Sequence, residues 1–224
     1  MPLTLNKSRE ISLLLTGIGL LVAAVYVDHH DNEPVFSPYR EGYTGDEINP
    51  IDRLGYTARD ERAGQFADAG LWGGPTLPLL LSLDPRTRPH YPVVLLLWLQ
   101  TMLLTFSLSS LIKNTVSRPR PYIYNENWEL EQRLTRKDRA AFLSGHAANA
   151  TAGSVLFASL LATYDHRFAR HAKFAAITIS CGTAYLRVKA GKHWITDAAA
   201  GILLGGGVAG AVINWHKAKP GKPV

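Results

Sequence analysis

Long segments without any charged residue are the feature that most constrains how this chain can fold. The longest, residues 91–112, has 22 residues and is rich in leucine. A bilayer core of about 30 Å is crossed by roughly 20 helical residues, so this segment alone is long enough to span a membrane. Five further uncharged segments have 17, 15, 18, 13 and 18 residues: 11–27, 69–83, 147–164, 174–186 and 198–215.

We therefore expect an all-α fold, an integral membrane six-helix bundle formed by a single domain over residues 1–224. The short segments 69–83 and 174–186 also fit buried core helices that do not cross the bilayer. The first segment, 11–27, also has features of a secretory signal peptide, with basic residues before it and Val22-Ala23-Ala24 as a weak cleavage site. It is long for the apolar region of such a peptide, and we favour an uncleaved anchor.

The composition narrows the possible functions. With 46% hydrophobic and 19% charged residues, the chain is neither disordered nor a nucleic-acid-binding arm. Its one cysteine, Cys181, excludes an internal disulfide and a cysteine-based zinc site. The net charge of +6 fits an anionic lipid or an anionic substrate. We expect the membrane and a lipid as partners and no nucleic acid, while the sequence leaves the oligomeric state open.

The charges between the apolar segments predict the orientation in the membrane. If the N-terminus is inside, the inner segments 1–10, 84–90, 165–173 and 216–224 carry ten Lys or Arg and three acids. The segment 28–70 has ten acids and four Arg, and would form an outer loop. This distribution follows the positive-inside rule. It predicts an integral protein of a bacterial inner membrane whose 113–120, 144–146 and 187–197 regions face the periplasm or the exterior.

Three groups of polar residues stand at the ends of apolar segments. Two of the loops that carry them, between the third and fourth and between the fifth and sixth helices, lie on the same face of the membrane. The groups can therefore meet at one surface. Their members are Lys113, Arg118 and Arg120; Ser144, Gly145 and His146; and Arg187, Lys189, Lys192, His193 and Asp197.

Taken singly, each group has a structural explanation. Lys113 and Arg120 resemble the basic anchors found at helix ends, and Ser144 is a good helix N-cap. Together, however, the groups suit an anionic tetrahedral ligand. Arg and Lys bind phosphate oxygens, and a Ser-Gly helix start presents backbone N–H groups to an anion. One His held by a carboxylate can act as a nucleophile while a second His protonates a leaving oxygen. Because no carboxylates cluster, we expect no metal and no other cofactor.

The order and spacing of these residues resemble the type-2 phosphatidic acid phosphatase superfamily. Its first motif is Lys, six residues, Arg-Pro; its second is Pro-Ser-Gly-His; its third is Ser-Arg, five residues, His, three residues, Asp. The chain has Lys113, Arg120 and Pro121 for the first motif, Ser144-Gly145-His146 after Leu143 for the second, and Arg187, His193 and Asp197 after Leu186 for the third. The two leucines are the departures, and they leave every charged or nucleophilic position intact.

The resemblance implies a role for each matched residue. Lys113, Arg120 and Arg187 would hold the phosphate oxygens, with Ser144 and the N–H groups of Gly145 and His146 completing the cradle. His193 would attack phosphorus and form a phosphohistidine, with Asp197 orienting it. His146 would protonate the leaving alcohol and then activate water.

The resemblance therefore implies a metal-independent membrane phosphatase that acts on a lipid phosphate or pyrophosphate. Phosphatidate, phosphatidylglycerophosphate, undecaprenyl pyrophosphate and a lipid A phosphate all remain open as substrates. One alternative is a soluble or secreted acid phosphatase with the same chemistry. Another is a non-catalytic protein that binds or transports lipid head groups. The segment 122–141, with aromatic and basic residues, is a candidate contact for the head group, although it also fits a solvated helix face.

Overall fold

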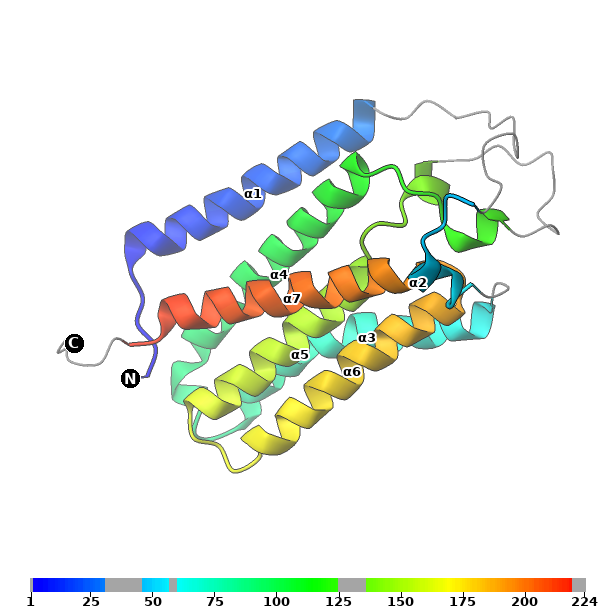
Figure 1. Cartoon of the computed structure of the whole chain (residues 1–224). Helices are drawn as coiled ribbons and strands as arrows, with labels where there is room; N and C mark the ends of the chain where they lie inside the picture. The colour runs from blue at the N-terminus through cyan, green and yellow to red at the C-terminus, as the bar shows by residue number, and fades with distance from the viewer. Residues whose placement is uncertain (1, 31–45, 57–59, 125–135, 219–224) are drawn as a thin grey trace.

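A computed structural model describes residues 2–30, 46–56, 60–124 and 136–218. Over these ranges the chain is all-helical and forms no strand, which confirms the all-α part of the prediction. The longer helices run side by side along one direction and make an elongated bundle (Figure 1). The elements are α1 (Lys7–His30), α2 (Pro50–Arg53), α3 (Glu61–Thr76), η1 (Leu77–Leu83), η2 (Arg88–His90), α4 (Tyr91–Thr115), η3 (Pro121–Tyr124), η4 (Arg136–Arg139), α5 (Gly145–Thr163), α6 (Ala169–Lys189) and α7 (Ile195–His216).

Three of the described helical segments are long and apolar enough to cross a membrane. They are Lys7–His30, Arg88–Thr115 and Ile195–His216, which contain the predicted segments 11–27, 91–112 and 198–215. The helices α5 and α6 form where the sequence predicts them and lie in the same bundle, but they do not reach the same combination of length and apolar composition.

The second predicted helix differs most from expectation. An α-helix begins at Glu61, with the Asp60 side chain accepting a hydrogen bond from the Ala63 N–H at 3.0 Å, and ends at Thr76. The chain then continues as the 3₁₀ helix η1 over Leu77–Leu83. Pro75 and Pro78 explain the change, since proline lacks the N–H that an α-helix needs and its ring crowds the preceding turn.

The helix α5 lies at the centre of the bundle and contacts α3, α4, α6 and α7. Small residues let its backbone approach its neighbours closely. A Cβ on Gly205 of α7 would stand 2.1 Å from the Ala148 carbonyl oxygen, and one on Gly74 of α3 would stand 2.5 Å from that of Ala150. Close backbone approach through small residues is the usual way in which membrane helices pack. In this protein, the close approach of α5 and α7 holds the N-terminus of α5 next to the N-terminus of α7.

The two ends of the described chain are tied together at the opposite end of the bundle. The backbone N–H of Thr4 donates to the carbonyl of His216 at 2.7 Å. Beside this contact the Glu10 carboxylate, buried, accepts hydrogen bonds from His216 Nε2 at 2.7 Å and from Gln100 Nε2 at 2.8 Å. This cluster joins α1, α4 and α7, and we call this end of the bundle the terminal end.

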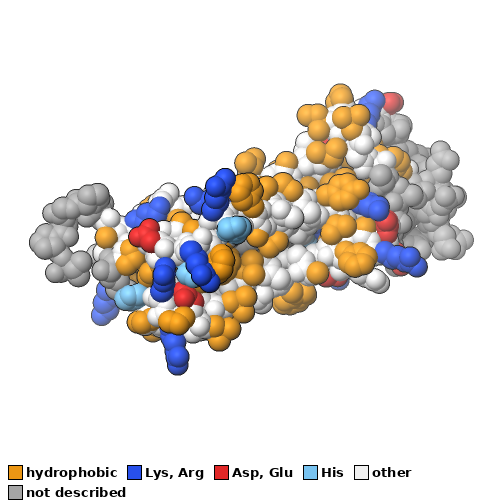
Figure 2. All heavy atoms as spheres, turned by 90° about the horizontal axis from the view of Figure 1, so that it is seen from below, with side chains coloured by type: hydrophobic (Ala, Val, Ile, Leu, Met, Phe, Trp, Pro, Cys, Tyr) orange, Lys and Arg blue, Asp and Glu red, His pale blue; other side chains and the backbone are white. Residues whose placement is uncertain are grey.

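The surface is that expected of a protein surrounded by lipid. Hydrophobic side chains are exposed along the bundle, whereas charged side chains gather towards its two ends in the view of Figure 2. Large apolar residues that are at least half exposed occur on the outer sides of four helices: Leu15 and Val22 on α1, Phe106 on α4, Phe174 and Ile177 on α6, and Leu203 on α7. In water such a surface would be an aggregation hazard, but in a bilayer it faces lipid chains.

Candidate active site

The three predicted groups of polar residues meet at the end of the bundle opposite the terminal end, which we call the site end. Lys113 lies in the last turn of α4 and Arg187 in the last turn of α6. His146 lies in the first turn of α5, and Asp197 lies in the first turn of α7. Four helix termini thus deliver these side chains to one place.

Three cations converge on His193. Lys113, Arg120 and Arg187 are all close enough to His193 to act on its charge. Arg187 is 4% exposed, and the Nε atoms of Arg120 and Arg187 are buried without a hydrogen-bond partner among the described residues. A buried donor without an acceptor costs free energy, and so do like charges held together. An anion bound among the three cations would relieve both costs.

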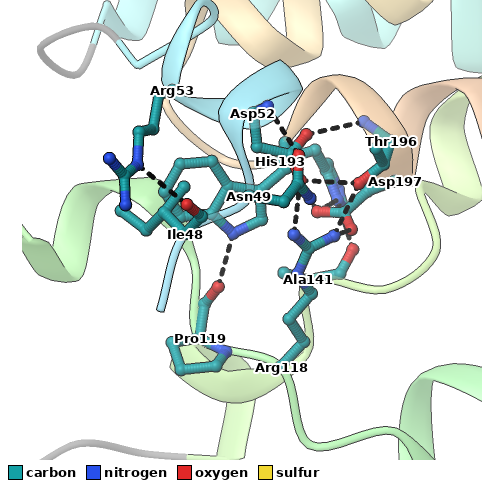
Figure 3. Close-up of polar contacts among 11 residues, drawn as sticks. Ile48, Asn49, Asp52, Arg53, Arg118, Pro119, Ala141, His193, Thr196 and Asp197 are labelled. Atoms are coloured by element: carbon teal, nitrogen blue, oxygen red, sulfur yellow. Dashed lines mark hydrogen bonds and ion pairs between the residues drawn. The ribbon is translucent and has the colours of Figure 1, made fainter. Parts of the chain in front are cut away.

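The His193 side chain is buried and hydrogen-bonded to the main chain. It is 1% exposed, and its Nδ1 lies 2.7 Å from the carbonyl oxygen of Ala141 (Figure 3). Because a carbonyl can only accept, Nδ1 carries the proton and Nε2 keeps its lone pair. Burial, together with the charges of Lys113, Arg120 and Arg187, holds the pKa of His193 well below its ordinary value. The ring is therefore neutral at physiological pH and has a nucleophilic nitrogen.

The contact that orients His193 differs from the one that the motif implies. The Ala141 carbonyl, and not Asp197, accepts the Nδ1–H hydrogen bond. Asp197 Oδ2 lies 4.0 Å from Nδ1 and accepts instead from the backbone N–H of Trp194 at 2.8 Å. The other oxygen, Oδ1, is paired with the Arg118 guanidinium. Asp197 thus supplies a nearby negative charge behind the ring, while a main-chain carbonyl fixes the ring's tautomer.

His146 has a partner that the sequence analysis did not include. Its Nε2 lies 2.9 Å from Oδ1 of Asp68, which projects from α3. The spacing of the three motifs gave no reason to select this carboxylate, because it lies 78 residues before His146 and in a different part of the chain. An acidic residue just before an apolar segment was the only signal available.

Ser144 and Gly145 form the start of α5 at the site end. The Ser144 side chain caps α5 by accepting from the Ala147 N–H at 3.4 Å, and its backbone N–H donates to the Asp197 carbonyl at 3.0 Å. A Cβ on Gly145 would stand 3.3 Å from Lys113 Nζ. Glycine therefore lets the lysine ammonium approach the helix N-terminus, where backbone N–H groups favour an anion.

The segment 122–141 is the candidate contact for the lipid head group. More than half of it lies outside the described residues. Residues 125–135, with Trp128 and Arg133, are not described. The Tyr122 and Asp138 side chains that flank this range are hydrogen-bonded to each other at 2.5 Å. Within the described ranges, no group of three or more His, Cys, Asp or Glu residues is placed to hold a metal ion.

A known protein family matches the region that carries these residues. The model of the PAP2 superfamily matches residues 94–220, more than half of the chain. The chain belongs to the PAP2 superfamily. Searches of curated proteins and of solved structures returned no match.

The family match covers the C-terminal part of this PAP2 protein and leaves residues 1–93 unmatched. The matched part contains every site residue that the motifs predict, from Lys113 to Asp197. Asp68 on α3 and Asp52 on α2 lie before it, although both contact site residues. The site is therefore completed by side chains from outside the matched range.

Proposed function

We propose that this PAP2 protein is a membrane-bound phosphatase that hydrolyses a lipid phosphate monoester or pyrophosphate through a phosphohistidine intermediate. Members of the superfamily are generally phosphatases, which supports the reaction class. The observation that carries the proposal is the convergence of Lys113, Arg120 and Arg187 on a buried, neutral His193. A protein that only binds head groups would need the cations but not the nucleophile.

The reaction follows from the positions of the side chains. The three cations and the N-terminus of α5 bind the phosphate oxygens and stabilise the charge of the transition state. His193 Nε2 attacks phosphorus and the bond to the leaving oxygen breaks, while His146 gives that oxygen a proton. Burial and the charge of Arg187 lower the pKa of His146 to about 4 in the free site, so the negative charge of the bound phosphate is what lets His146 carry that proton. A water molecule then attacks the phosphohistidine and loses its proton to His146, and the P–N bond breaks to release phosphate. The Asp197 carboxylate stabilises the positive charge on the His193 ring during both steps.

A groove beside the site supports a lipid as the substrate. A cavity of about 590 Å³ lies between α3, α4 and α5. One end reaches Lys113, Gly145 and His146, and the rest is lined mainly by apolar side chains of α3 and α4, which include Trp72, Leu99, Met102, Leu103 and Phe106. Trp72 and Phe106 are 71% and 53% exposed, so the groove opens to the side of the bundle. A lipid could thus present its phosphate to the cations while its chain lies along α4.

Phosphate release by the purified protein tests the proposal. We expect release from at least one member of a panel of lipid phosphates and pyrophosphates, without added metal and in the presence of EDTA. Vanadate should inhibit, because it adopts the geometry of the phosphoryl transition state. His193→Ala should abolish turnover, with Lys173→Ala, an exposed lysine at the other end of α6, as the control. Turnover by the folded His193→Ala protein would refute the mechanism.

A further inference from the structure

A buried carboxylate from outside the matched range contacts the first turn of α7. Asp52 on the short helix α2 has no exposed surface. Its side chain points towards Thr196 and Arg118 (Figure 3). Its Oδ1 accepts from the Thr196 backbone N–H at 2.9 Å, and its Oδ2 accepts from the Thr196 hydroxyl at 2.8 Å. The Asn49 amide and the Arg118 guanidinium also donate to Oδ2, each at 2.5 Å. Asp52 is thereby fixed to the residue directly before Asp197.

Arg118 links the two carboxylates. One terminal nitrogen of its guanidinium donates to Asp52, while the other donates to Asp197 Oδ1 and to the Thr196 hydroxyl, the latter at 2.8 Å. The guanidinium also lies 5.7 Å from the centre of the Trp194 ring. Arg118 therefore holds carboxylates, in contrast to Arg120, whose Nε is buried without a partner among the described residues.

In this arrangement the positive charge of Arg118 is shared by two carboxylates, those of Asp52 and Asp197. Although burial favours the neutral acid, hydrogen bonds from the Thr196 N–H, Arg118 and the Thr196 hydroxyl keep the pKa of Asp52 below its usual value. Asp52 is thus charged and competes with Asp197 for Arg118. Without that competition the guanidinium can turn towards Asp197 and take both of its oxygens, which would draw the carboxylate away from its position 4.0 Å from His193 Nδ1.

We propose that Asp52 is a positioning residue for the phosphatase reaction, holding Asp197 in place behind His193 through Arg118 and Thr196. The proposal rests on the function proposed above. The charge of Asp197 matters most when the His193 ring becomes positive, in the transition state and in the phosphohistidine. The phosphate-binding cations do not contact Asp52 in the described structure. Loss of Asp52 should therefore lower kcat and leave KM nearly unchanged.

A purely structural role makes a different prediction. If Asp52 only anchored the segment 46–56 to α7, its loss would lower the melting temperature, but each folded molecule would keep its kcat. The effect would also be independent of Arg118. Two readouts therefore separate the roles: kcat per folded molecule, and the dependence of the Asp52 effect on Arg118.

The experiment uses the full-length protein in detergent and compares Asp52→Asn, Arg118→Ala and the double variant. Rates are expressed per mole of monodisperse, folded protein, and the melting temperature of each variant is measured. We expect Asp52→Asn to lower kcat by at least about 10-fold with KM changed by less than about twofold. The double variant should lose no more activity than Arg118→Ala alone, because Asp52 acts through that residue. Asp52→Glu should recover part of the activity, since it keeps the charge.

The control is Asp28→Asn, which removes an exposed carboxylate at the site end of α1 and should leave kcat unchanged. An unchanged kcat in folded Asp52→Asn would overturn the proposal, as would losses that multiply in the double variant. Either result leaves the phosphatase function standing, provided that the wild-type protein releases phosphate and His193→Ala does not. Absence of release by the wild-type protein would instead refute the proposed function itself.

Discussion

At the scale of single residues, the site depends on keeping His193 neutral. The ring is buried, three cations surround it, and a main-chain carbonyl accepts its Nδ1–H. A buried imidazole beside positive charges resists protonation, so the nucleophile remains available when the pH falls. In the proposed mechanism, the cations that bind the phosphate thus also keep the attacking imidazole unprotonated.

This gives a pH prediction whose sign is fixed by the lowered pKa. His193 must be unprotonated to attack, and its pKa lies well below 6.5, so its protonation should not limit kcat/KM until the pH is well below that value. Lys113→Met removes one of the depressing charges and should move the acidic limb of the kcat/KM profile to higher pH. Profiles of wild type, Lys113→Met and the surface control Lys173→Met test this with one substrate, whose own ionisation is then common to all three. An acidic limb at the same pH in wild type and Lys113→Met would contradict it.

The sequence could not predict the residues that reach the site only through tertiary contacts. The motifs selected Lys113, Arg120, Ser144, Gly145, His146, Arg187, His193 and Asp197, and the structure brings this set to one end of the bundle. Asp52, Asp68 and the Ala141 carbonyl belong to no motif. Their parts in the site depend on where α2, α3 and the loop before α5 come to rest, and local sequence does not encode that.

At the scale of elements, the apolar segments predicted the helices well, and proline explains the main exception. The segments 91–112 and 198–215 lie within α4 and α7. By contrast, 69–83 is divided between the end of α3 and the 3₁₀ helix η1, because Pro75 and Pro78 remove backbone donors. The groove that reaches His146 is lined by residues of α3 and α4, and Pro75 at the break is one of them.

The groove predicts a dependence on the chain length of the substrate. Met102 and Lys113 both line it and are separated by 11 residues of α4, or about 16 Å along the helix. Met102→Trp should fill the far part of the groove and raise KM for a long-chain lipid phosphate, while a short-chain analogue keeps its KM. Kinetics with the two substrates in mixed micelles measure this difference. The control is Leu95→Trp, an exposed position on the same helix outside the groove, and equal effects of both variants would argue against the groove as the site of the chain.

A second prediction at this scale concerns the cluster at the terminal end. Glu10→Ala leaves His216 Nε2 and Gln100 Nε2 without their acceptor inside the bundle. Leaving buried donors unsatisfied costs about 1–3 kcal/mol, so the free energy of unfolding should fall by that order. Glu10→Gln keeps an acceptor oxygen and should be milder. Thermal unfolding in detergent measures the loss, while kcat of the folded protein should stay unchanged because the cluster lies at the far end from His193.

At the scale of the whole molecule, the exposed apolar surface and the two charged ends fit a protein that stands across a bilayer (Figure 2). The site end holds Lys113, Arg120 and Arg187, the cations proposed to bind the phosphate, whereas the described parts of the Lys- and Arg-rich inner segments lie at the terminal end. We propose that the site end lies outside the cytoplasm, as the positive-inside rule predicts. A phosphatase oriented in this way would act on lipids of the outer leaflet.

Cysteine labelling tests this orientation. On a Cys181→Ala background, Lys137→Cys places a thiol at an exposed position of η4 at the site end, and Arg86→Cys places one at an exposed position near the terminal end. An impermeant thiol reagent should label the first in intact cells or spheroplasts and the second only after the membrane is opened. The reverse pattern would place the active site inside and leave the chemistry unaffected.

The paired chain ends bear on how many times the chain traverses the bilayer. Thr4 and His216 share a main-chain hydrogen bond, so the start of α1 and the end of α7 lie in the same aqueous compartment. An odd number of traverses would place them in opposite compartments. Three of the described helices meet the requirements of length and apolarity by themselves, and three is odd. If all three cross the bilayer, we expect at least one of the less apolar described segments to cross as well, stabilised there by its contacts with other helices and not by its own affinity for lipid.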